Sequence, residues 1–160
     1  MSVAFTREES AETAAAVELP DRPVSPHPNL VTQAGQKALD ASMADARAAY
    51  HAAQLIEDLN ERRNAVAASS RDMRYFSERL RTAQLMPDPV ERHTVAFGSR
   101  VTFARDEGRR QTFRIVGEDE ADPRAGSISY VSPVARALIG KAVGDRVVLG
   151  DHEIEVLAVE

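Results

Sequence analysis

The hydrophobic positions of the sequence change their period once along the chain. From Leu30 to about Ala83 the chain is rich in Ala, Leu, Glu, Arg and Gln, and it contains no proline and, after Gly35, no glycine. This composition is typical of long helices. Two apolar runs within it advance alternately by four and three residues, which is the seam of a coiled coil. The first run is Leu39, Met43, Ala46, Tyr50 and Ala53, and the second is Met73, Phe76, Leu80 and Ala83.

Between Leu59 and Ala65, charged and amide residues replace the seam. We therefore predict a turn near residues 58–64 that folds the second helix back on the first. The expected element is an antiparallel coiled-coil hairpin over residues 29–86, with Thr32 as the N-cap of the first helix. At about 1.5 Å per residue, arms of about 24 residues would be roughly 36 Å long.

Beyond a short proline-bearing linker at residues 87–92, the hydrophobic period becomes two. Alternating or β-branched segments bounded by Gly, Asp and Pro predict strands. These segments are RVTFAR, QTFRIVG, GSISYV, DRVVLG and HEIEVLAVE. One helix interrupts them, with Ser132 as N-cap, Pro133 at its first position and Gly140 as its stop. Residues 93–160 are thus predicted to form a small antiparallel β-sheet domain with one helix, so the fold class of the chain is α+β.

Residues 1–28 show no periodic apolar pattern. They hold four prolines and five acidic residues against two arginines. This composition predicts a disordered N-terminal tail, and a partner-binding segment is the alternative.

Composition and charge exclude several function classes. The absence of cysteine removes disulfides, thiolate catalysis and Cys-based metal sites, and the four histidines are scattered, so no intrinsic cofactor is expected. The net charge of -5 argues against a free-standing nucleic-acid binder. No apolar run is long enough to span a membrane and the N-terminus does not resemble a signal peptide, so a cytoplasmic location is expected. A monomer is also expected, because the seam is satisfied within one chain.

The segment RIVGEDEADPRAGSISYVSPVARALIGKAVGDRV, residues 114–147, closely resembles the C-terminal domain of the GreA/GreB family of bacterial transcript-cleavage factors. In that family the most recognisable segment reads IVGDDEAD, followed by SPIARALIGK and GD. LVTQAGQKAL at residues 30–39 and RLRTAQLM at residues 79–86 are similar to the opening and the close of the family's coiled coil. The resemblance implies an FKBP-like fold for residues 93–160.

The resemblance also implies a function. Gre factors dock their C-terminal domain at the rim of the RNA polymerase secondary channel and push their coiled coil inward, where an Asp-x-x-Glu pair at the tip helps to hold a Mg²⁺ ion that activates water for cleavage of backtracked RNA. Carried over to DLNE in this sequence, Asp58 and Glu61 are the candidate catalytic and metal-binding carboxylates. The factor is then not itself an enzyme, and its Mg²⁺ is shared with the polymerase.

Departures from the family pattern leave a second interpretation open. Glu57 replaces the tip glycine, Arg62 and Arg63 follow the carboxylates, and each arm is about one heptad, or roughly 10 Å, shorter than we expect for the family. The alternative is a non-cleaving Gre-like regulator or Gre competitor, similar to the Gre-related regulator of nucleoside diphosphate kinase, Rnk. In that case Glu57 to Arg63 could be an ordinary solvated turn.

Two further sets of residues are candidates for contacts. The resemblance implies a basic patch on the second helix near the RNA 3′ end; the alternative is a solvated face with intrahelical pairs such as Glu78 with Arg74 or Arg81. Its members are Arg63, Arg71 and Arg74. The loop Glu118 to Gly126 and the following helix are candidate polymerase contacts, through Asp122, Ser132, Pro133 and Arg136. A prolyl-isomerase site is disfavoured, because it needs a deep aromatic pocket and this domain has few aromatic residues.

Overall fold

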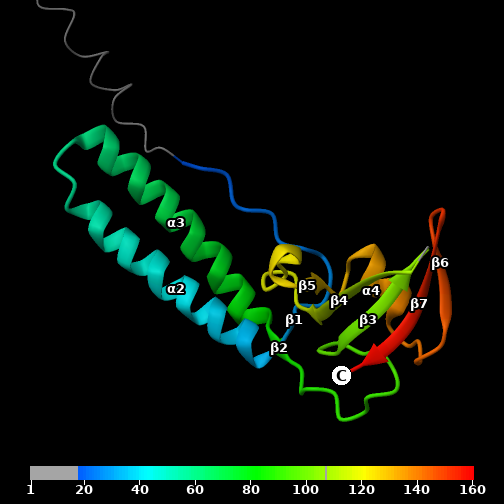
Figure 1. The fold of residues 1–160 in the computed structure, drawn as a ribbon. Helices are drawn as coiled ribbons and strands as arrows, with labels where there is room; N and C mark the ends of the chain where they lie inside the picture. The colour runs from blue at the N-terminus through cyan, green and yellow to red at the C-terminus, as the bar shows by residue number, and fades with distance from the viewer. Residues whose placement is uncertain (1–17, 107) are drawn as a thin grey trace, which may run out of the picture. The chain divides into compact units, whose positions relative to one another are not determined.

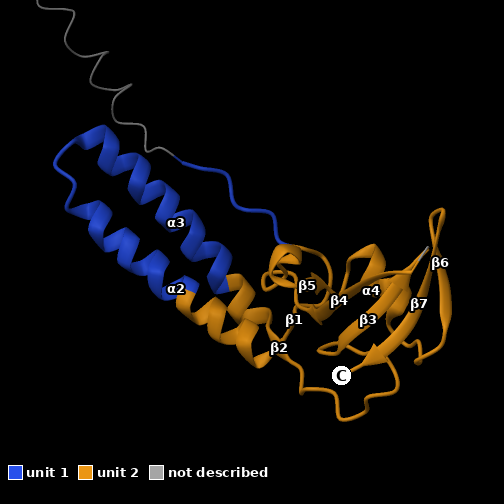
Figure 2. Cartoon of the chain, in the orientation of Figure 1, with its two compact units in different colours: residues 1–24, 42–77 blue, residues 25–41, 78–160 orange. Residues whose placement is uncertain are grey.

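The computed structural model describes residues 18–106 and 108–160. The described residues form two compact units (Figure 2). One unit contains residues 18–24 and 42–77, and the other contains residues 25–41 and 78–160. The two long helices each contribute residues to both units.

The predicted helical hairpin is confirmed (Figure 1). Helix α2 spans Gln33–Gln54 and helix α3 spans Leu59–Thr82. Thr32 caps α2 as predicted, because its Oγ1 accepts the backbone N–H of Gly35 at 2.9 Å. Neither helix, nor any other in the described ranges, has a stretch of 18 residues apolar enough to cross a bilayer.

The turn of the hairpin lies closer to the N-terminus than the sequence predicted. It occupies residues 55–58, and residues 59–64 already belong to α3. The polar stretch that suggested a loop at residues 58–64 is instead the exposed first turns of a helix. Asp58 caps the helix at that point by accepting the N–H of Glu61, and so fixes the turn before it.

The first seam is more deeply buried than the second. Leu39, Met43, Ala46 and Ala53 are buried, and Tyr50 is half-buried. The residues of the second seam are all half-buried. The most buried side chains of α3 are instead Ser69 and Arg79.

A two-stranded parallel pair lies beside the helix ends in the second unit. Strand β1, Leu30–Val31, pairs with β2, Gln84–Leu85, in parallel. Residues 29–86 were predicted as a helical hairpin alone, so these strands are an addition to it. Each strand has two residues, which is too short for a periodic signal.

The β domain contains the five predicted strands. They are β3 (Arg100–Arg105), β4 (Arg109–Val116), β5 (Ser127–Ser129), β6 (Arg146–Leu149) and β7 (His152–Val159). Their order in the sheet is β5-β4-β3-β7-β6. Three neighbouring pairs are antiparallel as predicted, but β5 pairs with β4 in parallel, so the sheet is mixed. The loop after β4 contains the short 3-10 helix η1 (Pro123–Ala125) and returns the chain in the same direction as β4.

Helix α4, Pro133–Leu138, closes the core of this domain. Ser132 caps it and Pro133 opens it, as predicted. Ala135 and Leu138 are fully buried and join the core built by the strands. The core residues from the sheet include Phe103 and Ile154, which alternate with more exposed positions along their strands, and Ile115, which is buried next to Val116 at the end of β4.

Part of the predicted disordered tail has definite contacts. Residues 1–17 lie outside the described residues. In the first unit, Arg22 lies against α3, with its guanidinium 3.8 Å from the centre of the Tyr75 ring. In the second unit, the Tyr130 hydroxyl donates a hydrogen bond to the Pro28 carbonyl. Residues 18–28 therefore differ from the prediction, because charged and carbonyl groups in this proline-rich stretch find partners far along the chain.

Candidate functional site

Asp58 occupies the N-cap position of α3. Its Oδ1 accepts the backbone N–H of Glu61 at 2.7 Å, and its carbonyl accepts the N–H of Arg62 at 2.9 Å. These bonds satisfy N–H groups that a helix start leaves without partners. The Asp-x-x-Glu spacing is also that of a capping box, in which the first residue caps and the fourth is Glu. The motif that suggested metal binding thus has a structural role at the start of α3.

The turn around Asp58 displays acidic and apolar side chains. Asp58 and Glu61 are both exposed. Leu55 is 83% exposed and Leu59 is 46% exposed, so two leucines accompany the carboxylates. Arg62 donates from Nη1 to the Ile56 carbonyl at 3.3 Å. Arg62, which follows the carboxylates in the sequence, is thus engaged with the backbone of the turn.

The two carboxylates fit a shared ion and not a complete metal site. Among residues 18–106 and 108–160, no group of three or more His, Asp or Glu side chains could hold a metal. Asp58 retains its second oxygen, and the Glu61 carboxylate is exposed. Mg²⁺ is commonly held by one or two carboxylates together with water and other oxygen ligands. Asp58 and Glu61 would therefore be the protein's share of such an ion.

The three candidate RNA-contact arginines all lie on α3 within the first unit. Arg74 donates from Nε to Asp21 Oδ1 at 2.6 Å, and its side chain is 49% exposed. Arg71 lies beside Asp72, with Nε and Oδ1 3.7 Å apart. Arg63 is half-buried. Two of these arginines therefore have carboxylate neighbours, one from the next residue and one from the N-terminal part of the chain.

The intrahelical pair expected for Glu78 forms with Arg81 and leaves Arg74 to another partner. Arg81 donates from Nη2 and Nε to the two carboxylate oxygens of Glu78, at 2.6 Å and 2.9 Å. These hydrogen bonds lower the pKa of Glu78 and raise the pKa of Arg81. Both side chains are exposed enough for the pair to be a solvated surface contact.

Two of the candidate docking residues are helix caps. Asp122 Oδ1 accepts the N–H groups of Arg124 and Ala125 and so begins η1. Ser132 Oγ accepts the N–H of Ala135 at 3.3 Å. Substitution of either residue would change the local backbone as well as the surface.

Arg136 is the candidate docking residue with an open surface. It is exposed on α4 and lines a hollow together with apolar and aromatic neighbours. These neighbours are His27, Tyr130, Val131 and Ile139. Pro133 is exposed on the same helix. A cation at the edge of an apolar hollow suits a partner that presents an apolar side chain beside a carboxylate.

The acidic loop after β4 fixes the helix ends, which the sequence did not reveal. Arg79 is 2% exposed and donates from Nε to Asp119 Oδ2 at 2.5 Å. Glu120 accepts the hydroxyl of the cap residue Thr32 at 2.6 Å. A Cβ at Gly35 would lie 2.5 Å from this Glu120 carboxylate, so the glycine makes room for it. The acids at residues 118–120 of this candidate docking loop thus contact the helix ends.

Comparison with known proteins gives matches along most of the chain. Residues 90–160 match the family model for the C-terminal domain of the transcription elongation factors GreA and GreB. The GreA of Pseudomonas aeruginosa is 38% identical over 136 residues, which cover 81% of this chain and 80% of the relative. The GreB of Neisseria meningitidis serogroup B is 44% identical over 96 residues, which cover 56% of this chain and 59% of that relative.

The solved structures that match this chain include the GreA factor homolog 1, Gfh1, of Thermus thermophilus. It is 21% identical to this chain, the match covers 84% of this chain and 99% of that structure, and the TM-score is 0.39.

Proposed function

The chain belongs to the GreA/GreB family of transcription elongation factors, and from this membership we propose that it binds bacterial RNA polymerase and modulates elongation at the secondary channel. It acts in the cytoplasm, where the polymerase works, as an accessory factor and not as an enzyme. Its C-terminal domain docks on the rim of the channel, and its helical hairpin carries the turn at residues 55–58 towards the polymerase active centre.

The observation that carries the proposal is the exposed pair Asp58 and Glu61, which lie at the end of the hairpin turn and in the first turn of α3. Asp58 uses only Oδ1 in the cap, and Glu61 is exposed, so both carboxylates are accessible to a ligand. We assign these residues to a Mg²⁺ ion that is completed by groups of the polymerase. When bound, that ion supplies charge stabilisation to the attacking and leaving oxygens in hydrolysis of the RNA backbone.

Contacts on both parts of the factor support this function. Arg136 and the hollow beside it offer a mixed apolar and cationic surface for docking on the polymerase. On α3, the guanidiniums of Arg63, Arg71 and Arg74 are suited to phosphate oxygens of the nascent RNA. Of the two ion-paired arginines, Arg74 has the more exposed side chain, at 49% against 33% for Arg71.

A second candidate function is a Gre-like regulator that binds polymerase without stimulating cleavage. The N-cap role of Asp58 favours it, because the Asp-x-x-Glu spacing is explained by the start of α3 without any metal. Such a protein would compete with cleavage factors for the same channel.

A transcript-cleavage assay in a backtracked elongation complex tests these alternatives. The variants are Asp58→Asn and Glu61→Gln, singly and together. Asparagine caps helices about as well as aspartate, so Asp58→Asn removes the charge and keeps the helix start. We expect wild type to shorten the RNA and the double variant to lose at least about tenfold in rate, which corresponds to about 1.4 kcal/mol of transition-state stabilisation.

Binding to polymerase is measured with the same proteins, together with Arg136→Glu as a docking variant. The proposal requires that the tip variants bind like wild type and that Arg136→Glu binds more weakly. Binding without cleavage by wild type, combined with displacement of a cleavage-active GreA, would establish the second candidate. Absence of binding by wild type would refute both.

A further inference from the structure

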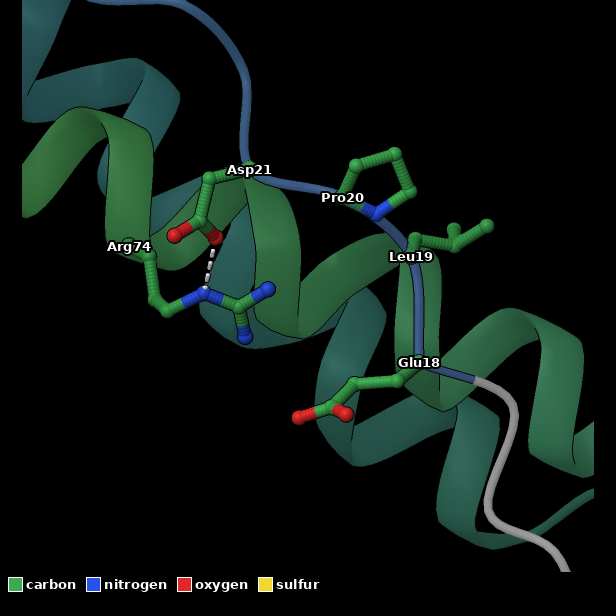
Figure 3. Close-up of a pocket in the computed structure, with 5 residues that line it drawn as sticks. All are labelled: Glu18, Leu19, Pro20, Asp21 and Arg74. Atoms are coloured by element: carbon green, nitrogen blue, oxygen red, sulfur yellow. Dashed lines mark hydrogen bonds and ion pairs between the residues drawn. The ribbon is translucent and has the colours of Figure 1, made fainter.

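Residues 18–24, here called the N-terminal segment, lie against α3 in the first unit. Figure 3 shows the Asp21 carboxylate directed at the Arg74 guanidinium, with Nε and Oδ1 2.6 Å apart. The neighbouring Arg22 donates from Nη1 to Asp72 Oδ1 at 3.2 Å. The Arg22 guanidinium also lies over the Tyr75 ring, 3.8 Å from its centre, and 5.1 Å from the centre of the Phe76 ring.

These contacts define one register for the segment. On the segment, the acid Asp21 pairs with the base Arg74, and Arg22, the next residue, pairs with the acid Asp72. The two ion pairs therefore have opposite polarity. Shifting the segment by one residue would place like charges together. The cation–π contact of Arg22 adds an interaction that depends on the ring and not on a carboxylate. The segment therefore recognises this part of α3 specifically.

The contacts are also suited to release. The side chains of Asp21 and Arg74 are 73% and 49% exposed, and exposed ion pairs contribute little individually and weaken with salt. The segment stays near α3 because the chain tethers it, which gives it a high effective concentration. A soluble ligand with several negative charges could replace it.

The segment occupies a residue that the proposed function assigns to RNA. Asp21 takes the Nε donor of Arg74, and Glu18 lines the same hollow between the segment and the helix (Figure 3). A carboxylate and a phosphate are recognised by arginine through the same charge-assisted hydrogen bonds. The acids of the segment therefore stand where RNA phosphates would bind.

We propose that the N-terminal segment is an intramolecular competitor of nucleic acid, which covers Arg74 until RNA phosphate displaces it. This inference rests on the proposed role of α3 in RNA contact. It adds regulation to that role: the factor engages RNA weakly while the segment is docked and more strongly when the segment is released.

The first test measures docking of the segment directly. Because the chain has no cysteine, Pro20→Cys and Ser77→Cys, both at exposed positions, can carry a pair of spin labels on the full chain. We expect a narrow distance distribution in the free protein. It should broaden in the variant Asp21→Asn/Arg22→Gln and when a short single-stranded RNA is added at low salt.

The second test measures RNA affinity by fluorescence anisotropy at several salt concentrations. Asp21→Asn/Arg22→Gln removes one charge of each sign, so the net charge of the protein is unchanged. We expect this variant to bind the RNA about two- to tenfold more tightly than wild type, with a steeper salt dependence because Arg74 gains a phosphate contact. Addition of Arg74→Gln should abolish the gain.

Asp45→Asn/Arg47→Gln is the matched control. Both residues are exposed on α2 in the first unit, and neither pairs with another of the residues that the structure describes. This control also leaves the net charge unchanged, and we expect wild-type affinity.

A broad label distribution in the free wild type would overturn the inference. So would equal RNA affinity, or no RNA binding, in wild type and in Asp21→Asn/Arg22→Gln. Binding to polymerase is measured separately and tests the proposed function. If wild type did not bind polymerase while Asp21→Asn/Arg22→Gln bound RNA more tightly than wild type, only the proposed function would be refuted.

Discussion

Asp58 has a capping role and a candidate metal-binding role, and an alanine substitution would remove both at once. Its Oδ1 caps α3 through the N–H of Glu61, while its exposed carboxylate is our candidate metal ligand. Loss of activity in Asp58→Ala would therefore follow from either a disordered helix start or a missing ligand. The same problem applies to Asp122 and Ser132, which cap η1 and α4. At each of these positions the informative variant keeps the capping hydrogen bond and changes only the charge or the exposed surface of the side chain.

We predict that Asp58→Ala lowers the free energy of unfolding by about 1 kcal/mol, the usual cost of losing an N-cap. Asp58→Asn should change it by a few tenths of a kcal/mol at most, because the amide oxygen accepts the same N–H. Chemical denaturation followed by circular dichroism measures both values. Equal stability of the alanine and asparagine variants would show that the cap does not hold this helix.

Among the elements, those with a clear period were predictable and those set by distant partners were not. The two helices follow from the two apolar seams, one beginning at Leu39 and one containing Phe76, and the strands follow from their alternation. The turn was placed too late because a polar first turn of α3 resembles a loop. Strands β1 and β2 and the parallel pairing of β5 depend on contacts between separate parts of the chain. No local pattern encodes such pairings.

At the end of α3, a buried arginine has a structural role that its charge alone did not indicate. Arg79 lies on the same arginine-rich helix as the candidate RNA contacts, yet it is 2% exposed and pairs with Asp119. Glu118 lies 3.9 Å from the same guanidinium. We predict that Arg79→Met lowers the free energy of unfolding by about 3 kcal/mol, because it removes the buried guanidinium that pairs with Asp119, whose side chain is 19% exposed.

The comparison variant is Arg81→Met, on the same turn of α3. Arg81 is exposed and pairs with Glu78 alone among the described residues, so we expect a change of at most about 0.5 kcal/mol. Denaturant titration of both variants measures the difference. Similar values for the two would contradict a role of Arg79 in joining α3 to the loop after β4.

For the whole molecule, the sequence carried the family assignment and the candidate tip, but not the contacts of the N-terminal segment. The C-terminal signature and the coiled-coil seam are local in sequence, and comparison with GreA confirms the family. By contrast, Asp21 and Arg22 meet partners about 50 residues away, at Arg74 and Asp72. A proline-rich acidic stretch has the composition of a disordered tail. Its charged residues find their partners only when the fold places α3 beside them.

The last prediction concerns the stability of the whole protein at alkaline pH. Burial raises the pKa of Tyr130 above its usual value of 10.0; the charge of Glu118 raises it further and that of Arg79 opposes the shift. The Tyr130 hydroxyl donates to the Pro28 carbonyl, and a tyrosinate has no proton to donate. A raised folded pKa means that the folded state holds this proton more tightly than the unfolded state. The stabilisation is therefore complete below pH 10 and is lost as pH rises from 10 through the folded pKa.

Tyr130→Phe isolates this effect, because the two proteins differ only in the Tyr130 hydroxyl. At pH 8 we expect wild type to be more stable than Tyr130→Phe by about 1 kcal/mol, the net value of one hydrogen bond. Above pH 10 wild type should lose stability faster than the variant, so the difference in unfolding free energy should shrink and then vanish. Urea titrations at half-unit steps from pH 8 to 11.5 measure it. A constant difference across that range would mean that the Tyr130 proton is held no more tightly in the folded protein than in the unfolded chain.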